Sequence, residues 1–228
     1  MFGRLKKVFG QDGAASAPPG VGGGPVSGWA ASRGLSYAAQ GDAGGFVLTG
    51  AVGSRPWKLE RGKASRDYIR GEELRARAEL KINDEVSVLV MNRPLKESLE
   101  KRAYEMYTDT LQTTADPSLP EEMRWLALYP EAGWSSLPDA FWARYSVMAD
   151  NRDHAMAWVE PALAGLLMSW PEPGPDPQLP FILMLMRGKA YLRMQYSPPT
   201  LATLDHAARI FTTACETAVG GLSTDIAL

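Results

Sequence analysis

The stretch LRARAELKINDEVSVLVM, residues 74 to 91, decides what kind of fold this chain forms. Its first half alternates strictly at a spacing of two, with Leu74, Ala76, Ala78, Leu80 and Ile82 set against Arg75, Arg77, Glu79 and Lys81. This is the period of a β-strand that buries one face and leaves the other in water. After a turn at 83–85, the near-continuous apolar run VSVLVM predicts a central strand covered on both faces.

Other segments extend this sheet. GFVLTGAV (45–52) and RPWKLERG (55–62) flank Gly53 and Ser54, which predicts a hairpin with a glycine-dependent turn. FILMLMRG (181–188) and KAYLRMQY (189–196) predict a second hairpin, turned near Gly188. AFWARYSVMA (140–149) alternates well enough to predict one more strand. Hairpins of this kind build antiparallel sheets.

Helices are predicted between these strands. The run after Asn92 has Pro94 in its first turn and an apolar side containing Leu95, Leu99, Ala103, Met106, Tyr107, Thr110 and Leu111. Ser118 is expected to cap a short helix over LPEEMRWLAL (119–128), and Ser27 another that stops at Gly34.

Two longer helical patterns occupy the C-terminal half. Asp150 is expected to cap a helix over 151–170 that Pro161 must kink or split. The last helix begins after Ser197 and Pro198 and repeats apolar residues at spacings of three and four, namely Leu201, Leu204, Ala208, Phe211, Cys215 and Ala218.

These elements predict an α+β fold, with antiparallel sheet or sheets covered on one face by amphipathic helices. Residues 1–27 are expected to form a disordered arm, because 10–28 contains seven glycines and no large aromatic residue. We expect one domain over 28–220, with two packed halves at 28–112 and 113–220 as the alternative, and a tail at 221–228.

Composition limits the cellular compartments and the classes of binding partner that we expect for this chain. A chain of 228 residues that is 45% hydrophobic can bury a real core, and Cys215 is its only cysteine. Its first residues lack the apolar run of a signal peptide, so we expect a reducing cytoplasm. Residues 1–109 carry about +4 and residues 110–228 about −6, a modest asymmetry that argues against nucleic-acid binding.

The segment MFGRLKKVF (1–9) permits a second location. Its apolar residues can share one helical face, with the cations beside it. Such a segment can contact an anionic membrane surface, and the residues that would do so are Phe2, Arg4, Leu5, Lys6, Lys7 and Phe9. Nine residues make a marginal helix in water, so a frayed soluble tail is the alternative. The expected location is therefore cytoplasmic, and a peripheral position at the inner membrane is the alternative.

Reactive side chains are few. Cys215 lies on an apolar helix seam and is expected to be a buried structural thiol. His154 follows Asp150 and Asp153, a grouping that fits a metal or general-base site as well as ordinary helix capping. His206 lies off the seam and is expected at the surface. No metal, cofactor or catalytic motif is recognised, so none is predicted.

A charged strand face and one tryptophan remain as candidates for binding. Cations gather on the first half of the chain, at Arg55, Lys58, Arg61, Lys63, Arg66, Arg70, Arg75 and Arg77. They form either the solvated face of a sheet, where mixed signs pair across strands, or a basic docking surface. Trp134, in the loop EAGWSSLP, is expected to be the most exposed of seven tryptophans.

Residues 141–217, with FWARYSVMADNRDHAMAWVEPALAGLL, FILMLMRGKAYLRM and a closing helix, resemble the C-terminal part of an uncharacterised bacterial family whose members are often membrane-associated. The resemblance implies no activity. We therefore expect a non-enzymatic bacterial interaction or accessory protein with a protein partner. The alternative is an enzyme whose site assembles in three dimensions around His154 and Asp150.

Overall fold

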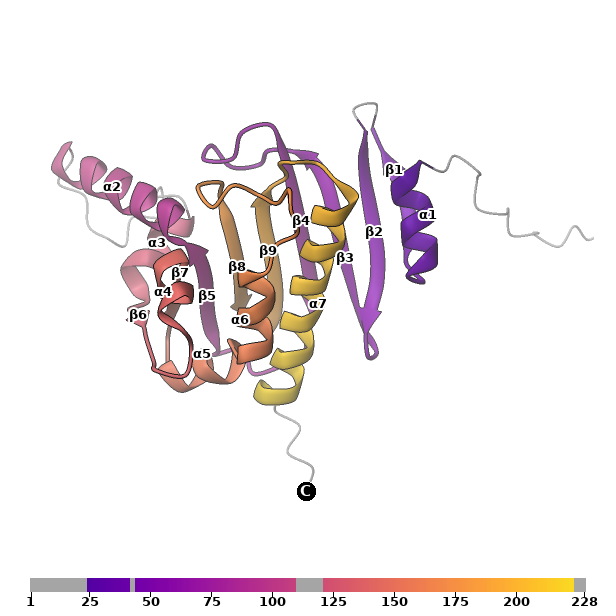
Figure 1. Cartoon of the computed structure of the whole chain (residues 1–228). Helices are drawn as coiled ribbons and strands as arrows, with labels where there is room; N and C mark the ends of the chain where they lie inside the picture. The colour runs from indigo at the N-terminus through magenta and orange to yellow at the C-terminus, as the bar shows by residue number, and fades with distance from the viewer. Residues whose placement is uncertain (1–23, 42–43, 110–120, 224–228) are drawn as a thin grey trace, which may run out of the picture.

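The computed structural model describes residues 24–41, 44–109 and 121–223, with the backbone alone for 106–109 (Figure 1). The helices are α1 (Pro25–Ser32), α2 (Arg93–Asp109), α3 (Glu121–Leu128), α4 (Asp139–Arg144), α5 (Arg152–Trp158), α6 (Pro161–Met168) and α7 (Leu201–Leu222). The strands are β1 (Ser36–Gln40), β2 (Gly45–Val52), β3 (Arg55–Lys63), β4 (Glu72–Glu79), β5 (Ser87–Asn92), β6 (Glu131–Ala132), β7 (Tyr145–Ala149), β8 (Phe181–Met186) and β9 (Lys189–Gln195).

All the described strands form one antiparallel sheet in the order β1-β2-β3-β4-β9-β8-β5-β7-β6. The predicted hairpins β2–β3 and β8–β9 are both present. The β8–β9 hairpin lies between β4 and β5, so these two strands are consecutive in sequence but do not pair. The connection from β4 to β5 therefore passes the β8–β9 turn, where the Leu80 amide donates to the Gly188 carbonyl at 2.8 Å.

Glycine is the favoured residue at position 188 of this crossing. Its φ is +68°, and a Cβ there would lie 2.5 Å from Asp84 Oδ1 in the β4–β5 connection. Arg187 before it also has a positive φ of 51°, as expected of a type I′ hairpin turn.

One face of the sheet is covered by α1 and by α4 to α7 (Figure 1). The alternating residues of β4, with Leu74, Ala76 and Ala78 buried, pack there against the apolar seam of α7. The seam is largely as predicted, since Leu204, Ala208, Phe211, Cys215 and Ala218 are buried and Leu201 is partly buried against the same core. Pro161 splits the predicted long helix into α5 and α6, again as expected.

A smaller core covers part of the second face. There Leu95 and Leu99 of α2 and Met123 and Trp125 of α3 pack on the strands β5, β7 and β8, whose contributing residues are Leu89, Met91, Met148, Ile182 and Met184. β5 is therefore buried on both faces, as its continuous apolar sequence predicted. The α+β fold with an antiparallel sheet is confirmed. Apart from the contact of Tyr191 of β9 with this smaller core, the second face of β1 to β4 and β9 carries no helix within the described residues.

Several local predictions are corrected. Residues 139–144 form α4, because Pro138 precedes a helical turn that buries Phe141, and the strand begins only at Tyr145. Asn151, not Asp150, caps α5 by accepting from the Asp153 amide. α1 begins at Pro25 after Gly24, inside the expected 1–27 arm. Ser118 and residues 1–23 lie outside the described residues.

Candidate functional site

The open face of the sheet carries charged side chains in register. On β3, β4 and β9, Lys58 lies opposite Arg77, which lies opposite Tyr191. In the neighbouring row, Glu60 lies opposite Arg75, which lies opposite Arg193. Two arginines side by side on adjacent strands repel each other unless a carboxylate lies between them.

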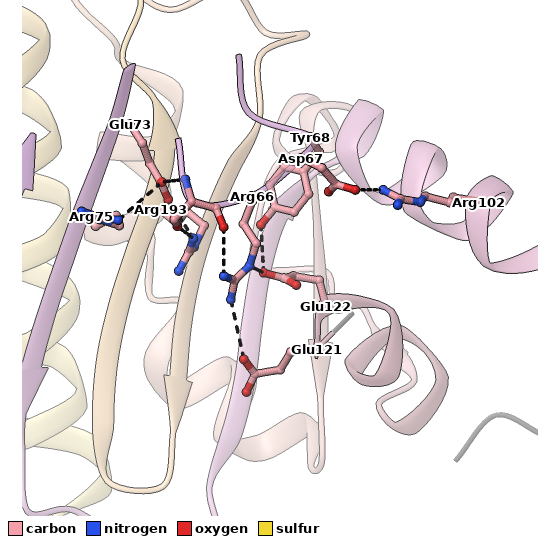
Figure 2. A network of polar contacts seen from close by, with 10 residues as sticks. Arg66, Asp67, Tyr68, Glu73, Arg75, Arg102, Glu121, Glu122 and Arg193 are labelled. Atoms are coloured by element: carbon pink, nitrogen blue, oxygen red, sulfur yellow. Dashed lines mark hydrogen bonds and ion pairs between the residues drawn. The ribbon is translucent and has the colours of Figure 1, made fainter. Parts of the chain in front are cut away.

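Glu73 of β4 is that carboxylate (Figure 2). It is 0% exposed. Its Oε1 accepts from Arg193 Nη1 at 2.8 Å, and its Oε2 accepts from the Ser65 amide at 2.7 Å. Arg75 Nη1 lies 4.0 Å from Oε2. One buried acid therefore holds both guanidinium groups close together at the same point of the sheet.

Arg75 retains unused hydrogen-bond donors. Its contacts with Glu73 and Glu60 are ion pairs at 4.0 Å, beyond hydrogen-bonding distance, and within the described chain it donates no hydrogen bond. The Nε atoms of Arg75 and Arg193 are both buried without a partner. These buried Nε atoms are closed to a partner, so an added acceptor can reach only the exposed part of Arg75, whose side chain is 33% exposed.

The connection between β3 and β4 borders this face and is tied to α3 (Figure 2). Arg66 Nε and the Tyr68 hydroxyl both donate to Oε1 of Glu122, which is buried. Burial raises the pKa of Tyr68, and the Glu122 charge raises it further. Burial lowers the pKa of Arg66, but the hydrogen bond to Glu122 and the nearby charges of Glu122, Tyr68 and Glu121 together outweigh this, so the pKa is raised. Arg66 therefore stays charged beside the open face.

Three cavities adjoin one another along this face. A cavity of about 160 Å³ is lined by Arg66, Glu121, Trp125, Met184, Met186, Arg187, Tyr191 and Arg193. The next, of about 360 Å³, shares Met184, Tyr191 and Arg193 with the first, and also includes Lys58, Glu60, Arg75 and Arg77. A third, of about 790 Å³, shares Ser65 and Arg75 with the second. We call this continuous depression, from Met186 to Gly62, the arginine groove.

The structure brings six of the eight predicted cations to the arginine groove, four in its first two cavities and Arg61 and Lys63 in its third. Lys58, Arg66, Arg75 and Arg77 line the arginine groove. Lys63 lies at its far end.

Arg55, Arg61 and Arg70 lie away from the charged rows of the open face. Arg55 and Arg61 share the opposite strand face with Trp57 and Leu59. Arg55 donates to the Leu80 carbonyl, while Arg61 forms a bidentate pair with Glu72 and lies 5.5 Å from the Tyr196 ring. Arg61 nevertheless reaches the third cavity at its edge. The exposed Arg70 lines a separate pocket beside α2.

Trp134 is not an exposed docking residue. It is 7% exposed and belongs to the main core, where its ring meets Trp142 edge to face at 4.9 Å. The prediction failed because the loop EAGWSSLP folds back over the sheet between β6 and α4, so a loop position did not mean a surface position.

The predicted reactive residues have structural partners. His154 Nδ1 and Asp150 Oδ2 lie 3.0 Å apart, and Asp150 Oδ1 accepts from the Ser87 amide, so this acid joins α5 to β5. Neither residue lines the arginine groove or the pocket beside α2. Cys215 is buried as predicted, and burial raises the pKa of its thiol to about 12. His206, expected at the surface, is 5% exposed and bonds to the Leu166 carbonyl.

The sequence prediction missed the β8–β9 side of the groove. Tyr191 and Arg193 alternate with buried Ala190, Leu192 and Met194, so their common face was readable from the period of two. Their position beside Arg75 and Arg77 was not, because it depends on β9 pairing with β4 across 120 residues of sequence.

Comparison with protein-family models, curated proteins and solved structures finds no significant match for this chain. Among the described residues, no helix is both long and apolar enough to cross a membrane. The same residues contain no cluster of three or more histidine, cysteine or acidic side chains arranged to hold a metal ion.

Proposed function

We propose that this chain is a non-enzymatic accessory protein that binds an acidic segment of a partner protein in the arginine groove. The observation that carries the proposal is Arg75, a partly exposed guanidinium that faces the groove without making a hydrogen bond within the described chain. A carboxylate of a partner can accept from its donors in the bidentate geometry that guanidinium groups favour.

The arginines are held in place before any partner arrives. Glu73 fixes Arg193, and the Tyr191 ring lies 6.0 Å from the guanidinium carbon of Arg77. Side chains that are already ordered lose less conformational entropy on binding, which favours affinity. Arg77 also pairs with the exposed Glu79 at 2.7 Å, a contact of small net value that a partner carboxylate can replace.

The sign pattern of the groove favours carboxylates at fixed positions over a uniform polyanion. Glu60 and Glu79 stand among the cations, so a continuous phosphate backbone or an anionic membrane surface would meet negative charges at these points. A peptide can place acidic residues next to the arginines and neutral ones next to the glutamates. The three strand spacings from β8 to β3 span about 14 Å, or roughly four residues of extended chain.

The test uses the full chain and a fluorescein-labelled peptide of sequence Gly-Glu-Glu-Gly-Phe-Gly-Glu-Glu-Gly, followed by fluorescence anisotropy. Replacing both Arg75 and Arg77 by Gln should weaken binding at least tenfold, because each lost charge-assisted hydrogen bond is worth about 1.5–3 kcal/mol. Arg152→Gln with Arg209→Gln is the matched control, since it also removes two exposed cations, but from α5 and α7. The control should bind like the unmodified chain.

Equal losses in the two double variants would mean that only net charge matters, and would contradict the proposal. Tighter binding of a single-stranded oligonucleotide or of anionic vesicles, dependent on Arg75 and Arg77, would replace the protein partner by another class. Vesicle binding that is lost when Lys6 and Lys7 become Gln would support the membrane contact expected of residues 1–9, which lie outside the described residues.

A further inference from the structure

We infer that the acidic segment carries one phenyl-sized apolar side chain, which enters the cavity between β8, β9 and α3. This inference rests on the proposed function, because it names a second feature of the same partner. The cavity is the end of the arginine groove where the sheet meets α3, and its apolar lining is Trp125, Met184, Met186 and Tyr191.

The size of the cavity fits an aromatic ring. Its volume is about 160 Å³, and an apolar cavity of roughly 150 Å³ is large enough to hold benzene. Met184 and Trp125 form its buried floor, while Met186 and Tyr191 are partly exposed, so the cavity opens to solvent. Methionine side chains adapt to the shape of a ligand and make favourable sulfur–aromatic contacts.

The rim of this cavity joins the apolar and charged parts of the groove. Arg66, Arg187 and Arg193 line the cavity together with one acid, Glu121, and Arg66 and Arg193 are also paired with Glu122 and Glu73. An apolar side chain entering here is therefore flanked by cations, which favours acidic residues on either side of it in the partner segment.

The register also sets the spacing of the partner's residues. Met184 lies opposite Tyr191, which lies opposite Arg77, so the cavity and Arg77 are two strand spacings apart. Two spacings are about 10 Å, which an extended chain covers in roughly three residues. The recognised segment therefore carries its carboxylates about three residues from the aromatic side chain.

The experiment compares two peptides of equal charge on the full chain, the Phe-centred peptide above and the same peptide with Ala at its centre. The Phe peptide should bind about ten- to a hundredfold more tightly, the range expected for burying a phenyl side chain. Met186→Glu should remove this preference by placing a charge in the cavity. Met156→Glu, at an exposed methionine of α5, is the matched control and should keep it.

A second measurement does not depend on any variant folding. In the chain labelled with ¹³C at its methionine methyl groups, the Phe peptide should shift the Met184 and Met186 signals by its ring current, and the Ala peptide should not. Equal affinity for both peptides, still lost in the Arg75 and Arg77 double variant, would overturn this inference and leave the proposed function intact. Failure of both peptides to bind would overturn the proposed function itself.

Discussion

The two sides of strands β4 and β9 differ completely although they share one backbone. On one side Leu74, Ala76 and Leu192 are buried beneath α7, and on the other Arg75 and Arg193 face the arginine groove. The first side contributes burial of apolar surface, which is the main stabilising term in folding. The second side pairs most of its charges within the sheet, so it contributes less to stability and remains available to a partner.

The largest effect is expected from breaking the apolar side. Phe211 of α7 is 0% exposed and meets the Trp57 ring of β3 edge to face at 6.2 Å. Phe211→Ala leaves a cavity between α7 and the sheet, and should lower the free energy of unfolding by about 3–5 kcal/mol. Urea denaturation measures this loss.

Leu128→Ala is the control for that experiment, because Leu128 is 68% exposed and its truncation should change stability by less than about 0.5 kcal/mol. If the two variants lost similar amounts, α7 would not be packed on the sheet as described.

An intermediate effect is expected from the buried charge on the open side. Arg193→Met removes the closest cation from Glu73 and leaves a fully buried carboxylate with only the Ser65 amide and the more distant Arg75. An uncompensated buried charge costs about 3–5 kcal/mol, and the remaining contacts should reduce this to about 2–3 kcal/mol. Thermal and urea unfolding report the change.

The double variant Glu73→Gln with Arg193→Met separates charge from packing. Neutralising the acid removes the uncompensated charge, so the double variant should be more stable than Arg193→Met alone. Additive losses would mean that the two side chains do not interact, and that Glu73 has no part in holding the groove arginines.

The same contrast explains how much of the fold was readable in the sequence. Alternation in 74–80, the continuous apolar run of β5 and the seam of α7 each reflect local burial, so their prediction was confirmed. The period alone could not separate helix from strand in 140–144, where six residues of α4 bury Phe141. The position of the β8–β9 hairpin between β4 and β5 depends on contacts between segments far apart in the sequence, so no local pattern predicts it.

The candidate site was likewise predicted only in part from the sequence. Lys58, Arg75 and Arg77 were predicted as one surface because they follow a period of two along neighbouring strands of a sheet. Arg55 and Arg61 were grouped with them by composition, although the same period places them on the other face. Glu73 was not predicted as part of the site, because an acid beside Glu72 shows no sign of burial in the sequence; its burial depends on the contacts with Arg193 and Ser65 in the folded chain.

The smallest predicted effect concerns a titratable group on the apolar side. His206 of α7 is enclosed between the Trp170 ring, 4.7 Å away, and the Leu166 carbonyl, 2.8 Å from its Nε2. Burial lowers the pKa of His206, so the folded chain favours the neutral imidazole. In the unfolded chain the ring takes up a proton near its ordinary pKa of about 6.5.

Acid therefore favours the unfolded state at this residue, and the stability that neutral His206 contributes is lost as the pH falls from 7 towards 5. His206→Gln can keep the hydrogen bond to Leu166 but cannot titrate, so its free energy of unfolding should depend less steeply on pH. One proton limits the difference in slope to about 1.4 kcal/mol per pH unit. Urea unfolding from pH 5 to 8 measures the pH dependence of stability in the unmodified chain and in the variant. Both have the same carboxylates, so these groups contribute equally to the two slopes. Parallel curves would show that the imidazole is not shielded from water, and that the apolar side of the sheet is more open at α6 than its packing indicates.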